Sequence, residues 1–414
     1  MKKGKVILRS HHKADTAKSY AELYQRYFQI GPVYFRDEFP YAFIGQRRYR
    51  LTHPTRLVDQ VLMVSLEDFR VIYAQSFTFR SQDGYEVLEH GGIHAWIRAG
   101  EPVRIRSGEE ERMIDEIPLV LDGILFLPVE GLMKLGYGMY TDWQKTYLAP
   151  GDYLGISEED DLFPSIGFVR EFGINATKKY GNLRECYYFR QGNTLMPYRL
   201  YVPSGYDPET PVKMIVYLHG GIPDATPDME IDMTAGRFEH VCEEHQYLLL
   251  AVDGYAEGFY GGKSPALNPE TADEEERRYL ELCEQETLCA IRHVMEEYSV
   301  DRENVFLMGN SMGGAGTLYL GRKYPHMFRA LAPCGCLTNQ DVYSIDLAGL
   351  RGKPTLMVCG TENVGFENMR DVIRDMRTLG IDAQLLIVGG GVHENAWIIG
   401  LPEILDFFDT HAGH

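Results

Sequence analysis

The residues best suited to chemistry form a pentapeptide with a serine at its centre, GNSMG at positions 309–313. It follows an apolar run, 305–308, that predicts a strand, and it opens a helical pattern that starts at Met312. A serine on a tight strand-to-helix turn needs small neighbours, and glycines on both sides leave its hydroxyl clear of the flanking elements. The pattern predicts that Ser311 is a nucleophile at the amino end of a helix, where positive partial charge favours an oxyanion.

A nucleophilic serine needs a general base, and thirteen histidines compete for that role. His393 is the best candidate, because it follows an apolar run, 384–388, and comes just before the last helical stretch. The glycines at 389–391 let its ring turn towards the serine hydroxyl, and imidazole is the side chain that titrates closest to neutral pH. His326 follows a Tyr-Pro pair in a predicted helix-to-strand connection, which makes it the weaker candidate.

The acid that orients the imidazole is expected in the turn after the apolar run 355–359. That turn reads GTENV at 360–364, and Glu362 is the nearest carboxylate. A glutamate can orient an imidazole and stabilise its cation as an aspartate does, so Glu362 is the predicted third residue. Asp341 and Asp346, which follow the preceding predicted strand, stay open as alternatives.

A second glycine-rich turn comes earlier in the chain, where the apolar run 215–218 is followed by His219, Gly220 and Gly221. Backbone N–H groups in such a turn can face the carbonyl oxygen of a substrate. We therefore predict that the N–H groups of Gly221 and Met312 are the oxyanion donors. His219 is expected to brace the turn by hydrogen bonding rather than to act as a base.

Short apolar strands alternate with helical stretches from about residue 182 onward, which favours a largely parallel sheet with helices on both faces. The predicted strands are 213–218, 247–252, 304–308, 329–333, 355–359 and 384–388, and the predicted helices are 234–245, 281–298, 312–323, 366–379 and 395–409. Residues 182–414 are therefore predicted to form one α/β domain.

From about residue 186 to 410 the chain resembles the α/β-hydrolase superfamily. The resemblance rests on YLHGG at 217–221, DRENVFLMGNSMGG at 301–314, CGTEN at 359–363 and GGGVHENAW at 389–397, in that order. The same motifs are similar to feruloyl esterase, polyhydroxybutyrate depolymerase and predicted-peptidase branches. The resemblance implies the α/β-hydrolase fold and a triad of Ser311, His393 and Glu362. It also implies oxyanion donors at Met312 and Gly221, whereas the acid turn departs from the aspartate that relatives usually carry.

The chain before this region contains an internal repeat, in which Asp59 corresponds to Asp122 and the run 61–64 to 124–127. Each copy predicts a strand, a polar turn, a strand and a short helix. In the second copy the turn is Asp122-Gly123 between apolar runs, which is typical of a tight hairpin. Residues 1–165 are predicted to form a smaller α+β domain.

The linker between the two domains is predicted at 151–181, which is rich in glycine and acidic residues. The stretch 117–143, IPLVLDGILFLPVEGLMKLGYGMYTDW, resembles the amino-terminal stalk domain of copper amine oxidases, over roughly 45–150. The resemblance implies an accessory module without a cofactor, so neither copper nor amine oxidation follows from it. A plain structural role and a binding or attachment role both stay open for this domain.

The composition describes a globular chain of 414 residues with a formal net charge of −19. This charge would repel phosphate backbones and no dense Lys/Arg stripe opposes it, so no nucleic-acid partner is expected. No apolar run approaches the ~18 residues of a membrane span, so we expect no transmembrane segment. The seven cysteines form no CxxC pair, which favours reduced thiols over a metal site, and no cofactor is predicted.

No secretory leader is visible at the amino terminus. The compartment stays open between the cytoplasm and a secreted or cell-surface location for a chain whose leader is missing. The sequence does not determine the oligomeric state, and a homo-oligomer stays open.

The predicted function is cleavage of a carboxylic ester, in a small molecule or a polymer, through an acyl-enzyme on Ser311. A serine peptidase of the prolyl-oligopeptidase type is the alternative, and a binding protein with an inert hydrolase domain is the third hypothesis. Two insertions, 222–235 and 254–273, are expected to wall the cleft. Tyr255 and Tyr260 in the second insertion are the predicted substrate-binding side chains.

Overall fold

The computed structural model describes residues 33–413, with internal gaps. The gaps are 37–38, 45–46, 60, 75–76, 91, 116, 130–136, 143–144, 151–178, 222–226, 256–257, 264–267 and 337–345. Most of the predicted linker at 151–181 therefore lies outside the described residues, and so does Asp341, one of the alternative acids.

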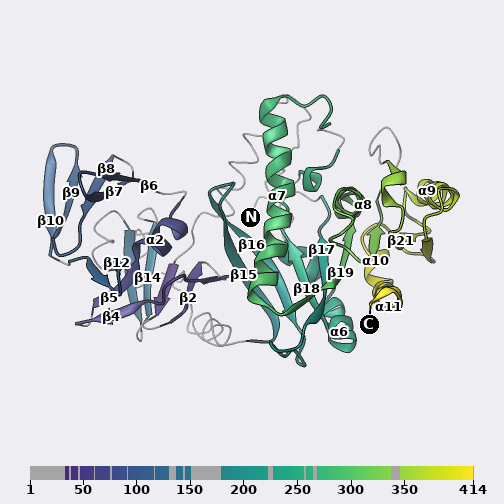
Figure 1. Cartoon of the computed structure of the whole chain (residues 1–414), viewed down its shortest axis with the longest axis horizontal. Coiled ribbons are helices and arrows are strands. Elements are labelled where there is room, and N and C mark those ends of the chain that lie inside the picture. Colours follow the sequence, from purple (N-terminus) through teal and green to yellow (C-terminus); the bar gives the residue numbers. More distant parts are fainter. Residues whose placement is uncertain are drawn as a thin grey trace, which may run out of the picture.

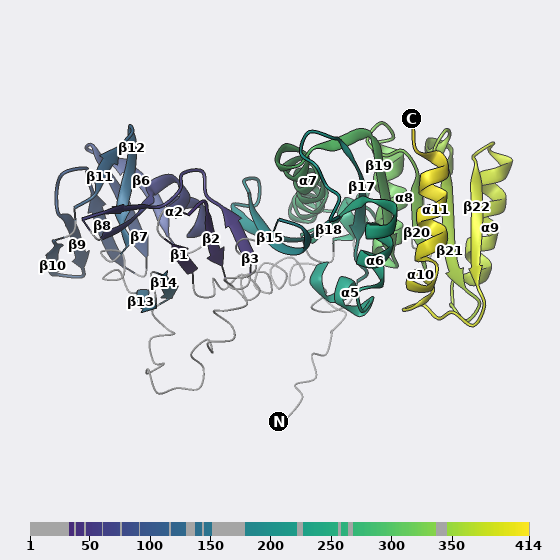
Figure 2. The same cartoon turned by 90° about the horizontal axis from the view of Figure 1, so that it is seen from below.

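The larger part of the chain is built around a mixed sheet, and this sheet contains all six predicted strands. Its strands are β15 (Gly181–Phe189), β16 (Thr194–Val202), β17 (Val212–Leu218), β18 (Tyr247–Val252), β19 (Val300–Asn310), β20 (Leu331–Cys334), β21 (Thr355–Gly360) and β22 (Ala383–Val388). They lie side by side in the order β15-β16-β18-β17-β19-β20-β21-β22, which can be followed across the molecule in Figure 2. From β18 to β22 neighbouring strands are parallel, whereas β16 is antiparallel to both of its neighbours.

Helices cover both faces of this sheet, as the alternating pattern predicted. One face packs against α7 (Glu274–Glu297), α8 (Met312–Lys323) and α9 (Phe366–Thr378). The other packs against α5 (Pro227–Met233), α6 (Arg237–His245), α10 (Ala396–Ile399) and α11 (Leu401–His411). Figure 1 shows α7 and α6 on either side of the strands.

Three helix boundaries differ from the sequence prediction, each for a local reason. Helix α7 begins earlier than expected because of a capping box. The Asp273 carboxylate accepts the Glu276 N–H, and the Glu276 carboxylate accepts the Asp273 N–H. The predicted helix 234–245 begins later, as α6 at Arg237, because Ala235 and Gly236 have φ values of 50° and 83° that break the helical path after the separate helix α5. The predicted helix 395–409 is divided in two at Gly400.

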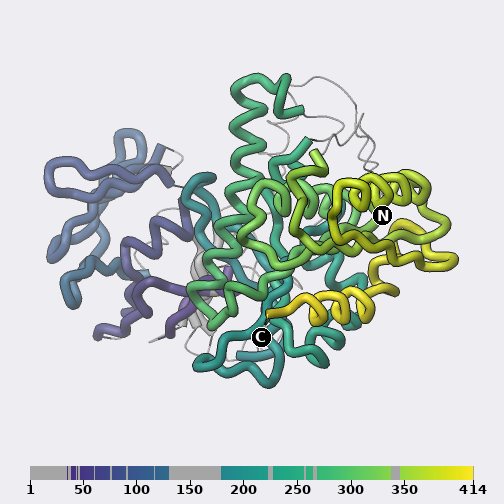
Figure 3. Tube along the Cα trace, turned by 45° about the vertical axis from the view of Figure 1, so that its right-hand side comes forward, coloured from purple at the N-terminus to yellow at the C-terminus, as the bar shows by residue number. Residues whose placement is uncertain are grey.

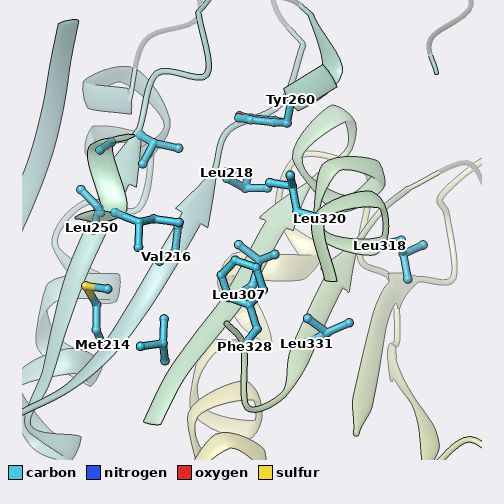
Figure 4. Close-up of a cluster of buried hydrophobic side chains, with 14 of the residues drawn as sticks. Met214, Val216, Leu218, Leu250, Tyr260, Leu307, Leu318, Leu320, Phe328 and Leu331 are labelled. Carbon is cyan, nitrogen blue, oxygen red and sulfur yellow. The ribbon is translucent and has the colours of Figure 1, made fainter. Parts of the chain in front are cut away.

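The core beneath α7 and α8 is built from alternate residues of the central strands. Val216 of β17, Leu250 of β18 and Leu307 of β19 are fully buried and point to the same face. Figure 4 shows them packed with Leu320 of α8, whose apolar side covers the strand ends. Burying these side chains fixes α8 on the sheet, and with it the turn that precedes α8.

The smaller part of the described chain is rich in β-structure and contains the predicted repeat. The hairpin β4 (Arg56–Val58) and β5 (Val61–Ser65) corresponds to the hairpin β11 (Leu119–Leu121) and β12 (Ile124–Pro128). The turn residues Asp59 and Asp122 share the same left-handed backbone, with φ values of 48° and 52°. Val64 of the first copy pairs with its equivalent Leu127 in an antiparallel ladder, so the two hairpins are related by a local twofold. The repeat is confirmed for the strands.

The helix after the first hairpin, α2 (Leu66–Ile72), is also as predicted, whereas the second copy's helix lies largely outside the described residues. Between the copies runs an antiparallel sheet of β6 (Thr78–Gln82), β7 (Tyr85–His90), β8 (Ile93–Ile97), β9 (Val103–Ser107) and β10 (Glu110–Ile114). The described residues of this part are therefore mainly strands rather than an even α+β mixture.

The two parts share one sheet. Strands β1 (Val33–Arg36), β2 (Tyr41–Ile44), β3 (Arg47–Arg50), β13 (Tyr137–Asp142) and β14 (Lys145–Pro150) extend the sheet of the larger part to 13 strands within the described residues. The join is made by β3, which runs parallel to β15. Pairing covers the outer edge of β15, which would otherwise present open N–H and C=O groups. In Figure 3 the purple and blue strands lie on the left of the molecule, and the yellow-green and yellow segments lie to their right.

Candidate active site

Ser311 lies on the turn between β19 and α8, as the pentapeptide predicted. Its φ and ψ of 55° and −113° are unusual for a residue with a side chain, and its N–H donates to the Cys334 carbonyl oxygen at 2.8 Å. The turn fits because its flanking residues lack Cβ atoms. A Cβ on Gly309 would lie 2.6 Å from the backbone of Gly313, and one on Gly313 would lie 2.8 Å from the His219 carbonyl oxygen.

The turn after β17 lies beside the start of α8. A Cβ on Gly220 would lie 3.5 Å from Cβ of Ser311, and one on Gly221 would lie 3.4 Å from Sδ of Met312. Met312 is the first residue of α8, so its N–H has no intrahelical acceptor. The structure thus brings the two predicted oxyanion donors next to each other and next to the serine.

His219 braces this turn, as predicted. The ring is buried, and its two nitrogens lie 2.8 Å from the Gly220 carbonyl oxygen and 2.7 Å from that of Asp253. Glu286 helps to hold the Asp253 carbonyl oxygen in place, because its carboxylate accepts the N–H of the next residue, Gly254, at 2.8 Å. Burial, and then the charge of Asp253, raises the pKa of Glu286 to about 8.

Tyr260, predicted to contact substrate, instead belongs to the core. Its side chain is 0% exposed, and its hydroxyl donates to the His219 carbonyl oxygen at 2.9 Å. The ring occupies a slot that two glycines leave open, since a Cβ on Gly254 or Gly316 would come within 2.3 or 2.4 Å of it. The prediction of a substrate-binding role for Tyr260 is therefore wrong. The residue is a second brace of the oxyanion turn.

Tyr255, the other predicted substrate-binding residue, is half-buried. Its ring packs between those of Phe189 and Tyr279, at centroid distances of 5.9 and 6.2 Å. The ring therefore belongs in part to an aromatic cluster. A contact between Tyr255 and substrate stays a prediction. Two stretches of the insertion that carries it, 256–257 and 264–267, lie outside the described residues.

His393 follows β22 and reaches the same edge of the sheet as Ser311. A Cβ on Gly335 would lie 3.4 Å from Nδ1 of His393 and 2.8 Å from Oδ1 of Asn310, the residue before the serine. Both groups therefore lie next to Gly335. Within the described residues no hydrogen bond joins Ser311 and His393, a looseness that is common before substrate binds.

The residue that contacts the imidazole is Asn363, and sequence reasoning missed it. Nδ2 of Asn363 lies 3.0 Å from Nδ1 of His393, and the Asn363 side chain is buried. Glu362, the predicted acid, is exposed, and only its backbone N–H is held, by the Gly391 carbonyl oxygen at 3.0 Å. The turn after β21 thus buries the side chain of Asn363 and leaves that of Glu362 in solvent. The signal in the sequence was the asparagine of GTEN, the closest isostere of an aspartate.

Asp346 does not contact the histidine either. It is exposed and caps the short 3-10 helix η3 (Leu347–Leu350), where its carboxylate accepts the Ala348 N–H at 3.1 Å. Asp341 lies outside the described residues, so its alternative role stays a prediction.

All seven cysteines are free thiols. Burial raises the pKa of Cys336 to about 12 and that of Cys359 to about 11, so these thiols beside the site are not nucleophiles near neutral pH. In the part of the chain that the structure describes, no group of His, Cys, Asp and Glu side chains is arranged to hold a metal ion. Nor does any described helix combine the length and apolar character needed to span a membrane.

Comparison with known proteins gave one family match and several similar solved structures. Residues 191–343 match the model of the esterase family, described as "Putative esterase". The chain is similar to the fluorophosphonate-binding serine hydrolase F of Staphylococcus aureus, at 15% identity and a TM-score of 0.44, over 55% of this chain and 98% of that one. A search of curated proteins gave no match.

Two further solved structures are similar. One is an S-formylglutathione hydrolase of Agrobacterium tumefaciens, at 17% identity and a TM-score of 0.45, over 57% of this chain and 98% of that one. The other is a ferulic acid esterase of Anaeromyces mucronatus, at 19% identity and a TM-score of 0.43, over 57% and 92%.

A sheet in the order β15-β16-β18-β17-β19-β20-β21-β22, with a serine on the turn between β19 and its following helix, is the architecture of the α/β-hydrolases. The described sheet therefore has the α/β-hydrolase fold. The esterase family model matches the segment that holds the turn after β17 and Ser311, which supports a carboxylic ester hydrolase.

Proposed function

We propose that this protein cleaves carboxylic esters through a covalent acyl-enzyme on Ser311. The observation that carries the proposal is the contact between the turn after β17 and the start of α8. Gly221 and Met312 are next to each other there and next to the serine, which supports their N–H groups as donors to the oxygen of an attacked carbonyl.

In the first half-reaction, Oγ of Ser311 attacks the ester carbonyl carbon while His393 takes the hydroxyl proton. The carbonyl oxygen becomes an oxyanion that accepts hydrogen bonds from Met312 and Gly221. When the tetrahedral intermediate collapses, the carbon–oxygen bond to the alcohol breaks and His393 returns the proton to the departing alcohol. The acyl group stays on Ser311.

In the second half-reaction a water molecule attacks the acyl-enzyme, and His393 removes a proton from that water. The carboxylic acid leaves, and Ser311 recovers its proton from the histidine. An ester is favoured over a peptide as substrate, because the family match is to esterases and no described carboxylate pair is placed to hold a substrate amino terminus.

The test is hydrolysis of p-nitrophenyl esters of graded acyl length beside a set of aminoacyl-p-nitroanilides. We expect a burst of p-nitrophenol equal to the enzyme concentration, followed by slower turnover, and no cleavage of the anilides. Ser311→Ala should abolish both phases. The matched control is Ser107→Ala, which alters an exposed serine of β9, distant in sequence from Ser311. It should change neither the burst nor the turnover. Anilide cleavage without ester cleavage would contradict the proposal.

A further inference from the structure

The imidazole of His393 faces a carboxamide where a serine hydrolase normally offers a carboxylate. Nδ1 of His393 lies 3.0 Å from Nδ2 of Asn363, and among the described residues no carboxylate hydrogen-bonds to this histidine. Asn363 is buried and follows β21, whereas its neighbour Glu362 is exposed. The group that orients the imidazole is thus neutral.

The hydrogen-bond network fixes which end of the amide faces the ring. Oδ1 of Asn363 accepts the Gly365 N–H at 2.9 Å. If the amide were turned over, its NH₂ group would face the Gly365 N–H, and two donors would oppose each other in a buried place. Oδ1 therefore stays on Gly365, and the NH₂ group donates to His393.

This direction determines the tautomer of the ring. Nδ1 of His393 can accept a hydrogen bond from Asn363 only through its lone pair, so the single proton of the neutral imidazole is on Nε2. A general base needs the opposite arrangement, with Nδ1–H donating to the orienting residue and the Nε2 lone pair free for the Ser311 hydroxyl. An amide also lacks the charge that would stabilise the imidazolium formed during attack.

We infer that Asn363 is the positioning residue of His393 and that it holds the neutral ring as the Nε2–H tautomer, which leaves this esterase with an attenuated base. The inference rests on the proposed function, and it means that a single isosteric change to the aspartate should raise the activity. In a serine protease, the reverse change from aspartate to asparagine keeps the geometry and lowers kcat about 10⁴-fold through the wrong tautomer.

The test is Asn363→Asp in the full chain, with kcat/KM for a p-nitrophenyl ester followed against pH. The Gly365 N–H can still donate to the new carboxylate, so the turn should persist. We expect kcat/KM near neutral pH to rise at least ~100-fold, within the range set by the protease change. The acidic limb of the profile should move to higher pH, because the carboxylate favours the imidazolium. An unchanged or lower kcat/KM would overturn the inference.

A second measurement reads the tautomer directly. Nitrogen-15 NMR of the ring should show the proton of His393 on Nε2 in the natural protein and on Nδ1 in Asn363→Asp. A proton on Nδ1 in both proteins would overturn the inference whatever the rates. The matched control is Asn368→Asp, which adds the same charge on nearby α9 and should alter neither the tautomer nor kcat/KM.

Two outcomes separate this inference from the proposed function. If a fluorophosphonate labels Ser311 in the natural protein, but labels it no faster in Asn363→Asp, the acyl-enzyme proposal stands and the inference fails. If neither protein is labelled while both are folded, the proposed function itself fails. Asp341 is the rival candidate for the residue that orients His393. If Asp341→Asn loses turnover and Asn363→Asp gains no activity, the orienting role belongs to Asp341 and the inference fails.

Discussion

A Cβ atom on Gly313 would lie 1.9 Å from the carbonyl oxygen of Leu218, the last residue of β17. This is far inside van der Waals contact, so the first turn of α8 rests directly on the end of the neighbouring strand. The contact brings the turn that begins at His219, the proposed oxyanion turn, against the serine. The second glycine of the pentapeptide is therefore required by packing between two elements and not only by the bend itself.

Substitution of this glycine should disturb the fold, because the clash is with backbone that no side-chain rotation relieves. We expect Gly313→Ala to lower the free energy of unfolding by at least about 1–3 kcal/mol, measured by urea denaturation. The control is Gly389→Ala, where a Cβ would meet nothing within 4 Å. Its change should stay within about 0.5 kcal/mol. Equal stability of the two variants would contradict the packing argument.

The join between the two parts of the chain contains a buried ion pair. Arg48 of β3 binds Glu185 of β15 through Nε at 2.7 Å, and the two side chains are 8% and 7% exposed. Arg48→Ala should cost about 3–5 kcal/mol, because it leaves a buried carboxylate unpaired. Arg50→Ala, on the same strand, breaks a pair with Glu297 in which the arginine is 57% exposed, and should cost only about 0–1 kcal/mol.

Urea denaturation of both variants measures these costs. Burial raises the pKa of Glu185 to about 7, so the cost of removing Arg48 should grow as the pH rises and the carboxyl loses its proton. A cost that is the same for the two arginines would mean that the pair does not hold the join.

Glu286 should make stability depend on pH. Its folded-state pKa is about 8, above the ordinary value of 4.5, so the folded chain keeps a proton that the unfolded chain releases. The free energy of unfolding should therefore fall as the pH rises from about 4.5 to about 8 and level off above that. Glu286→Gln should remove most of this slope, because the glutamine stays neutral.

Urea denaturation at several pH values across this window measures the slope. Glu281→Gln changes an exposed carboxyl on the same helix and should keep the slope of the natural protein. A slope that survives unchanged in Glu286→Gln would assign it to other groups.

Tyr260 should matter for catalysis although it does not reach substrate. Tyr260→Phe keeps the ring in its slot but removes the hydrogen bond to the His219 carbonyl oxygen, which should cost about 0.5–1.5 kcal/mol of stability. We also expect kcat for an ester to fall while KM stays nearly constant, because the oxyanion turn loses a brace. Tyr180→Phe, at an exposed position, should change neither quantity. A rise in KM with constant kcat would instead indicate a substrate contact.

The sequence indicated those parts of the molecule whose pattern is local. The six strands from β17 to β22 are apolar runs bounded by turns, and Ser311 is marked by the glycines its turn requires. The β15–β16 hairpin escaped prediction because it buries charged residues such as Glu185. That burial is possible only beside Arg48, which is distant in sequence, so no local pattern reveals it.

The site shows the same division. That the turn after β21 faces the histidine was predictable from strand order, but whether Glu362 or Asn363 points inward depends on one residue of rotation in a turn. Tyr260 was misassigned because the same sequence pattern, an aromatic residue among glycines, fits both a loop that lines the cleft and a ring that is buried in the core. Only the positions of Gly254 and Gly316 against the ring distinguish the two.

The most direct test of the central claim is covalent trapping of the nucleophile. The folded protein is treated with a fluorophosphonate near neutral pH, and the mass increase is located by peptide mapping. We predict one adduct per chain, on Ser311, much slower labelling in His393→Ala, and none in Ser311→Ala. An adduct on another residue, or none on the folded natural protein, would contradict the account.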